Sequence, residues 1–178
     1  MKYLERVNFV ARTDSLTRRE VEGVLDLLTE GNRLVMRTAL HTGLRVGDVL
    51  ALKTAQIRPK FWITEQKTGK KRQVGLPAAL RADILAEAGP VWAFPGRYPD
   101  KPRTRQAVWK DIKRAAKALR LPVNVGTHSA RKTYAVELLR RTGDLEQVQR
   151  ALNHDRLETA LIYAMADHRR KKRRRRNG

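Results

Sequence analysis

ALHTGLRVGDVLAL, residues 39–52, brings a helix end, an arginine and the start of a second helix into one short stretch. The apolar residues before Gly43 follow helical spacing, and glycine often ends helices because it adopts the left-handed backbone without steric cost. We therefore expect a helix from about Asn32 to Gly43 and a short helix beginning near Val46. Arg45 would lie at the junction between them.

Helical periodicity continues on both sides of this stretch. Thr17 and Glu20 have the spacing of a capping box, and the apolar residues after them predict an amphipathic helix that ends near Gly31. Beyond an irregular, proline-rich crossing at residues 89–103, the pattern is helical again. Further helices are predicted near residues 104–119, 128–141, 144–152 and 156–165.

The periodicity changes between residues 57 and 76. Short β-branched or aromatic stretches flank the sequence KTGK at residues 67–70, and a glycine-containing break between two short strands is typical of a hairpin. Pro77 then suits the first turn of another helix, whose apolar stripe would be Leu80, Ile84 and Leu85. The predicted fold class is mainly α with a small antiparallel β-sheet (α+β).

The chain is strongly basic. Its 178 residues suffice for one domain with a proper core, and 39 Lys and Arg against 18 Asp and Glu give a formal charge of +21. Such an excess suits a polyanionic partner, either nucleic acid or an anionic membrane surface. No long apolar run and no signal peptide are present, so we expect a cytoplasmic, nucleoid-associated protein without a membrane partner.

Metal and nucleotide chemistry are not expected. Cysteine is absent, which excludes disulfides, thiolate zinc sites and cysteine nucleophiles. The four histidines lie in no H-E-x-x-H pattern or comparable cluster with carboxylates. Gly69 and Lys70 are followed by Lys71, so the pattern of a phosphate-binding loop is not met. We therefore predict that no cofactor is used.

Four segments carry chemically distinctive residues: residues 39–52, EQKTGKKRQVGLP (65–77), THSARKTYAVELL (127–139) and ALNHDRLETALIYAM (151–165). In order and spacing they resemble the catalytic domain of the tyrosine recombinases, the phage integrase family. The resemblance extends from about Leu16 to Met165 and implies the fold of a tyrosine recombinase catalytic domain.

The expected organisation is a leader, a catalytic domain and a tail. We place the leader at residues 1–14, the catalytic domain at 15–167 and a basic tail at 168–178. Most members of the resembled family also carry an N-terminal helical core-binding domain, and because only about 15 residues precede the catalytic opening in this sequence, we expect that domain to be lacking. We expect either a natural stand-alone form or an excised domain.

The resemblance assigns six catalytic positions: Arg45, Lys67, His128, Arg131, His154 and Tyr163. When an alcohol attacks a phosphodiester, the nonbridging oxygens gain charge, and planar guanidinium groups match their geometry. The two arginines would hold the phosphate, His128 would manage the proton of the nucleophile, and His154 would donate a hydrogen bond to the phosphate. Asp48 is expected to face Arg45 and hold its guanidinium. Asn153 stands where many members have glycine, and asparagine tolerates the left-handed backbone.

Two of these positions have close competitors. Lys67 would protonate the departing 5′ oxygen; Lys70 and Lys71 lie nearby, but Lys67 precedes the turn glycine as the family's lysine does. Tyr163 would be the nucleophile, because a phenolate leaves more readily than an alkoxide and keeps the exchange reversible. Tyr134 is its one serious rival, and its apolar neighbours favour a place in the core.

Other basic residues are expected to contact DNA phosphates. Eight of them form a continuous run near the C-terminal end, which would repel itself and be disordered when free. The expected DNA contacts are Lys70, Lys71, Arg72, Lys132, Arg169, Arg170, Lys171, Lys172, Arg173, Arg174, Arg175 and Arg176.

Together these features imply a site-specific DNA recombinase or integrase. It would cleave and rejoin double-stranded DNA through a 3′-phosphotyrosyl intermediate, as a homo-tetramer on DNA, and it would need neither metal nor ATP because the intermediate keeps the bond energy. Two alternatives stay open. A type IB topoisomerase would relax supercoils without joining different sites, and a non-catalytic DNA-binding or architectural protein would need the charge but not the tyrosine.

Overall fold

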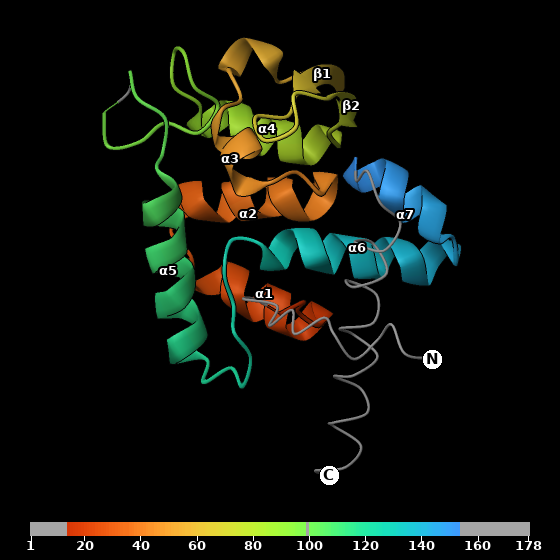
Figure 1. Ribbon diagram of the computed structural model, residues 1–178. Helices are drawn as coiled ribbons and strands as arrows, with labels where there is room; N and C mark the ends of the chain where they lie inside the picture. The colour runs from red at the N-terminus through yellow and green to blue at the C-terminus, as the bar shows by residue number, and fades with distance from the viewer. Residues whose placement is uncertain (1–13, 99, 154–178) are drawn as a thin grey trace, which may run out of the picture.

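The structure is a computed structural model that describes residues 14–98 and 100–153 (Figure 1). Its helices are α1 (Arg18–Leu27), α2 (Glu30–Thr42), α3 (Val46–Leu50), α4 (Ala78–Glu87), α5 (Arg105–Ala118), α6 (Ser129–Thr142) and α7 (Leu145–Leu152), with a 3₁₀ turn at Thr54–Gln56. The strands β1 (Lys60–Thr64) and β2 (Lys71–Gly75) form one antiparallel sheet, so the predicted fold class is confirmed. Residues 1–13, the helix predicted at 156–165 and the basic tail lie outside the described residues. Among the described residues, no helix combines the length and apolarity needed to cross a lipid bilayer.

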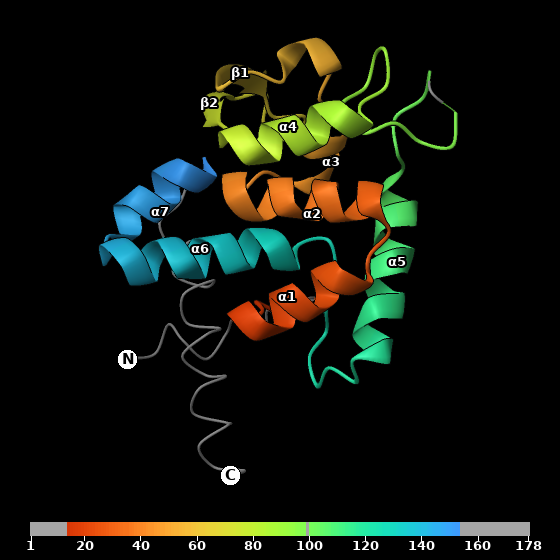
Figure 2. The same cartoon turned by 180° about the vertical axis from the view of Figure 1, so that it is seen from behind.

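Helix α2 is the centre of the fold. It contacts α1, α3, α4, α5 and α6, and its residues Leu34, Val35 and Ala39 are buried in the main hydrophobic core. Figures 1 and 2 show α4 on one side of α2 and α6 on the other, while α5 crosses one end of these helices. The residues that follow α2 are therefore fixed by core packing on both sides.

The boundary between α1 and α2 differs from the prediction. The capping box of Thr17 and Glu20 is present, but α1 ends at Leu27 and Gly31 lies inside α2. The reason is tertiary: the backbone N–H and the hydroxyl of Thr29 both donate to Oδ2 of Asp111 on α5, each at 2.9 Å. This anchor turns the chain at Thr29, which becomes the N-cap of α2.

The end of α2 is as predicted. Gly43 has a φ of 68°, and its N–H donates to the carbonyl oxygen of Ala39. Arg45 follows as the N-cap residue of α3, with extended backbone angles. The glycine therefore stops one helix and lets the next begin three residues later, which places Arg45 between two helix ends.

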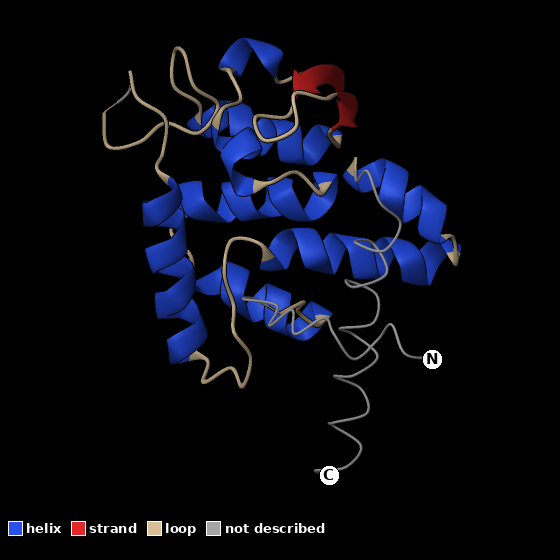
Figure 3. Ribbon diagram, in the orientation of Figure 1, coloured by secondary structure: helices blue, strands red, loops and turns tan. Residues whose placement is uncertain are grey.

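The predicted hairpin is confirmed (Figure 3). Phe61 and Ile63 of β1 and Val74 of β2 face the core, while the alternate residues face outward. The turn closes with two backbone bonds, from the N–H of Glu65 to the oxygen of Lys70 and from the N–H of Gly69 to the oxygen of Glu65. The hairpin thus presents residues 66–69 at its tip.

The helix after the hairpin corrects one detail of the prediction. Pro77 is the N-cap of α4 and not part of its first turn, and Leu80 and Ile84 are buried as expected. Leu85, in contrast, is 45% exposed. It lies about 100° around the helix from Ile84, outside the narrow stripe that faces the core.

Candidate active site

Arg45 is held by a buried carboxylate that the sequence did not single out. Its Nη1 donates to Oε2 of Glu65 at 2.5 Å, and Glu65 is 0% exposed. The expected partner was Asp48, and that expectation is corrected. Oδ1 of Asp48 instead accepts a hydrogen bond from the backbone N–H of Gln66 at 2.9 Å. Because Glu65 and Gln66 begin the hairpin turn, α3 is tied to this turn through both Arg45 and Asp48.

Arg72 points inward and not toward solvent. Its Nη2 donates to the carbonyl oxygen of Thr42 at 2.7 Å, and its Nη1 lies 3.6 Å from Oε1 of Glu65. Burial lowers the pKa of Arg72, and the charge of Glu65 opposes that shift. The expectation that Arg72 contacts DNA is therefore not supported, because its guanidinium is engaged inside the fold.

Lys67 lies at the tip of the hairpin. It is exposed, as is Lys71, whereas Lys70 is half-buried. Next to Lys67, the hydroxyl of Thr68 donates to Oε2 of Glu65 at 3.1 Å. The turn that carries the lysine is thus connected through Glu65 to Arg45, which was predicted from a different segment.

Arg131 connects two helix ends. It is 2% exposed, and its Nη1 donates to the carbonyl oxygen of Gly43 at 2.5 Å while its Nη2 donates to that of Leu152 at 2.6 Å. These oxygens are at the C-terminal ends of α2 and α7, where helix carbonyls lack partners within the helix. Arg131 therefore brings the start of the Arg45 segment and the segment preceding His154 to the same place.

Asn153 adopts the conformation expected of it. It is the C-cap of α7 with a φ of 53°, in the left-handed region. His154 and Tyr163, the two remaining predicted catalytic residues, lie outside the described residues.

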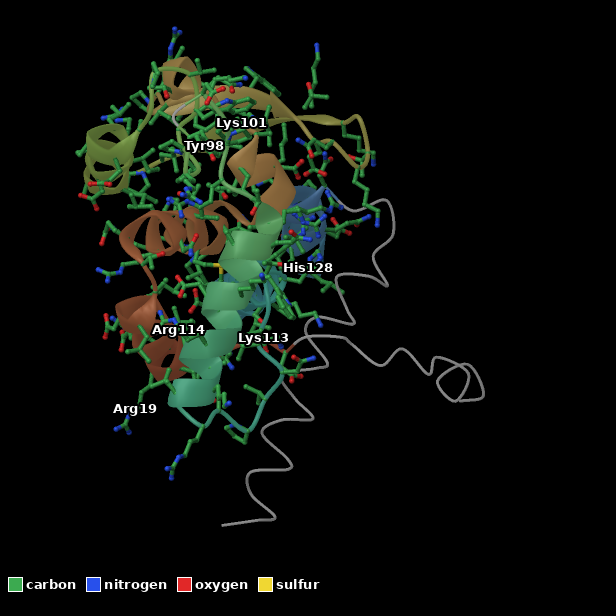
Figure 4. All side chains as sticks on the ribbon, turned by 90° about the vertical axis from the view of Figure 1, so that its left-hand side faces the viewer. Arg19, Tyr98, Lys101, Lys113, Arg114 and His128 are labelled. Carbon is green, nitrogen blue, oxygen red and sulfur yellow. The ribbon has the colours of Figure 1, made fainter. Side chains whose placement is uncertain are left out.

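His128 lies among positive charges. It is the N-cap residue of α6, three residues before Arg131, and Figure 4 shows it beside α5. Partial burial lowers the pKa of His128, and the charges of Arg105, Arg131 and Arg45 lower it further. The neutral imidazole is therefore favoured near pH 7, and a neutral imidazole can accept a proton.

Arg105 is a neighbour of the site that the sequence reasoning missed. It is the first residue of α5, and a Cβ added to Gly47 of α3 would lie 3.9 Å from its Cδ. Spacing along the chain gave no signal for this contact, because α5 and α3 meet only through the tertiary fold. For Glu65 a weak signal existed, since it is the one acidic residue in the basic stretch 58–76.

Burial bears on two further expectations. Lys132, expected to contact DNA, is 7% exposed, and burial lowers its pKa while Asp14 opposes that shift. Its contact with DNA stays a prediction. Tyr134 is half-buried and packs against the small cluster around Leu138 and Leu152, as its apolar neighbours predicted.

Within the described part of the chain, no group of three His, Cys, Asp or Glu is placed to hold a metal ion.

Comparison with known proteins places these features in a family. A model of the phage integrase family matches residues 14–170. The probable integrase/recombinase YoeC of Bacillus subtilis (strain 168) is 30% identical over 134 residues, which cover 72% of this chain and 74% of that protein. The integrase of Escherichia phage P2 is 30% identical over 154 residues, which cover 85% of this chain but only 43% of that protein.

A solved structure shows the same fold. The lambda integrase (75–356) dimer bound to a COC′ core site superposes with a TM-score of 0.70 at 21% identity, covering 86% of this chain and 59% of that chain. The described helices and hairpin are thus arranged as in an integrase. Because the family match spans most of the sequence and YoeC is similar over most of its own length, the chain belongs to the phage integrase family.

Proposed function

We propose that this chain is the catalytic part of a tyrosine-type site-specific DNA recombinase. The observation that carries the proposal is that Arg45, from the start of α3, lies near His128 and Arg131, from the start of α6, while Arg131 bonds to Gly43 and Leu152. Relatives named integrase and tyrosine recombinase support it. Simple DNA binding requires cations on the surface but no buried arginine next to a histidine of lowered pKa.

In the proposed reaction, the phenolic oxygen of Tyr163 attacks the scissile phosphorus. A bond forms between tyrosine and the 3′ phosphate, and the bond to the 5′ oxygen breaks. His128 accepts the phenolic proton, and Lys67 supplies a proton to the departing 5′ oxygen. Arg45 and Arg131 stabilise the charge on the nonbridging oxygens, and His154 donates a hydrogen bond to them. The hydroxyl of a partner strand then reverses these steps.

The proposed partner is double-stranded DNA. The formal charge of +21 supplies the attraction, and several exposed or half-buried cations lie near aromatic rings. Lys101 is 5.8 Å from the ring centre of Tyr98, and Lys113 is 5.9 Å from that of Trp109; Figure 4 labels Tyr98 and both lysines.

Lambda integrase has been solved as a tetramer bound to a Holliday junction, and we propose four protomers on two DNA sites for this chain also. Because its proposed partner is DNA, we propose that the protein acts in the cytoplasm, on the DNA of the nucleoid.

Covalent capture tests the proposal. A library of nicked duplexes with a randomised target region is incubated with the protein in EDTA, and adducts that survive denaturant are isolated and sequenced. We expect an adduct at Tyr163 on a restricted set of sequences. The adduct should accumulate because, at a nick, the short fragment that carries the free 5′ hydroxyl diffuses away and cannot be rejoined. Tyr163→Phe should bind the selected DNA without forming an adduct.

The alternatives predict other outcomes. An adduct mapped to Tyr134, or formation only with Mg²⁺, would contradict the assignment. Relaxation of supercoiled plasmid without any recombinant product from paired sites would indicate a type IB topoisomerase. Binding without any adduct in the wild-type protein would indicate an architectural protein.

A further inference from the structure

The carboxylate of Glu65 lies where three elements meet. Its Oε2 accepts from Nη1 of Arg45 at 2.5 Å and from the hydroxyl of Thr68 at 3.1 Å, and its Oε1 is 3.6 Å from Nη1 of Arg72. Arg45 belongs to the start of α3, Thr68 to the hairpin turn and Arg72 to β2. A wholly buried ionised carboxylate requires opposite charge, and the two arginines provide it.

The backbone of the turn closes on the same residue. The N–H of Glu65 donates to the oxygen of Lys70 at 3.0 Å, and the N–H of Gly69 donates to the oxygen of Glu65 at 2.8 Å. Lys67 lies between these two bonds. Movement of Glu65 would therefore shift the turn that presents Lys67 as well as the guanidinium of Arg45.

We propose that Glu65 is a positioning residue that fixes Arg45 and the Lys67 turn as one unit. The inference rests on the proposed function, in which Arg45 holds the phosphate and Lys67 protonates the leaving group. A guanidinium presents its donors in a rigid planar fork, so a bond to one nitrogen sets the direction of the remaining edge. Glu65 thus fixes the position of the Arg45 guanidinium relative to the turn that carries Lys67 before DNA binds.

A purely structural role is the rival explanation. In that case Glu65 would only neutralise the buried Arg72, and its loss would weaken the fold without affecting Arg45 and Lys67 together. The distances favour positioning, since the separation from Arg72 exceeds that of a hydrogen bond whereas the contact with Arg45 is short. The two roles predict different kinetics.

The kinetic test compares Glu65→Gln with Glu22→Gln in single-turnover cleavage of the selected duplexes. Glu22 is a matched control because it also pairs with an arginine, Arg18 at 3.0 Å, but on the exposed face of α1. We expect Glu65→Gln to slow cleavage by about 10- to 100-fold with DNA affinity nearly unchanged, because a small misplacement of catalytic groups is costly. Glu22→Gln should cleave at the wild-type rate.

Two comparisons separate positioning from general damage. With a 5′-bridging phosphorothiolate, whose sulfur leaves without an acid, the part of the defect caused by misplaced Lys67 should disappear and the part caused by Arg45 should stay. In an Arg45→Lys background, Glu65→Gln should cost less than it does in the wild type. Full additivity with Arg45→Lys, together with no rescue by sulfur, would overturn the proposal.

Thr68→Val tests the same proposal if Glu65→Gln does not fold. It removes the hydroxyl link to Glu65, together with the long bond of 3.4 Å that the hydroxyl accepts from the N–H of Lys70, and it leaves Arg45 in place. We expect a smaller loss of rate that the phosphorothiolate substrate restores almost completely. An equal defect on both substrates would contradict the coupling between Glu65 and the turn.

A measurement without DNA keeps this inference separate from the proposed function. In the free protein, Glu65→Gln should speed amide exchange at Gly69 and shift the ¹⁵Nε signal of Arg45, while Glu22→Gln should change neither. If both signals stay unchanged, Glu65 does not fix the unit, whatever the wild type cleaves. If they change but the wild type forms no adduct, the proposed function fails and the link between Arg45 and the turn stands.

Discussion

Gly43 lies directly against the ring of Tyr134. A Cβ added to this glycine would lie 2.5 Å from Cδ1 of the tyrosine, a distance that side chains do not tolerate, and its φ of 68° is itself unfavourable for other residues. The carbonyl of the same glycine accepts the bond from Arg131. Helix end, aromatic packing and the candidate active site therefore meet at one residue.

Gly43→Ala should destabilise the protein much more than Gly143→Ala. Gly143 has nearly the same φ, 67°, but nothing lies within 4 Å of an added Cβ, so it reports the backbone cost alone. We expect about 1 kcal/mol for Gly143→Ala and about 3 kcal/mol for Gly43→Ala, measured by urea unfolding. In a Tyr134→Ala background the cost of Gly43→Ala should fall to that of Gly143→Ala. Equal costs at the two glycines in the wild type would show that Tyr134 moves aside freely.

Asp111 should make stability sensitive to acid. Burial alone would raise the pKa of Asp111, but hydrogen bonds from Asn32, Thr29 and Arg114 outweigh it and lower the pKa to about 2 from its usual 3.8. A lowered folded-state pKa contributes stability that is full above the unfolded value and is lost as the pH falls through the folded one. The contribution at pH 7 is about 2 kcal/mol.

Urea unfolding of Asp111→Asn across pH measures this contribution. The variant should be less stable than the wild type at pH 7, and the difference should shrink as the pH falls from about 4 to about 2. Asp26→Asn, which changes an exposed carboxylate on α1, serves as the control and should track the wild type. If the difference in unfolding free energy between Asp111→Asn and the wild type stays constant down to low pH, the charge of Asp111 does not stabilise the fold, and the loss comes from altered packing or hydrogen bonding.

Within the described residues, local patterns were enough to predict the helices and the hairpin. The capping box at Thr17, the stop at Gly43 and the left-handed Asn153 depend on backbone preferences of the residues themselves, and each is found where the sequence placed it. The break at Thr29 was missed because it depends on Asp111, 82 residues away. A residue pattern cannot show which distant side chain will accept a bond.

The sequence could indicate the candidate site only in part, again because tertiary packing decides which side chains meet. Arg45, His128 and Arg131 lie near one another in the fold, and their catalytic roles stay predictions. Arg72 and Lys132 were expected on the DNA surface, yet both are turned inward. In a chain with 39 cations, sequence alone gives their number, but only the packing of α6 and the hairpin decides which of them face solvent.

Lys67→Ala should cleave ordinary DNA poorly and phosphorothiolate DNA well. If Lys67 protonates the 5′ oxygen, a sulfur leaving group needs no acid, so the defect should be largely rescued. Lys71→Ala, which changes a second exposed lysine in the same hairpin, is the matched control and should show no difference between the two substrates. Rescue of Lys71→Ala in place of Lys67→Ala would move the acid to that residue, and equal defects on both substrates would make Lys67 a phosphate contact.

Removing Arg169–Arg176 should weaken DNA binding mainly through salt dependence. The deletion lowers the formal charge from +21 to +13. If about half of the eight charges meet phosphates, the slope of log affinity against log salt should fall by about 3 to 4, at roughly 0.9 per phosphate. Preference for selected over random DNA should barely change, because phosphate contacts carry little sequence information. Replacing the eight residues with glutamine keeps the length and should reproduce the deletion. An unchanged slope with loss of multimer assembly on DNA would show instead that the segment docks on a neighbouring protomer.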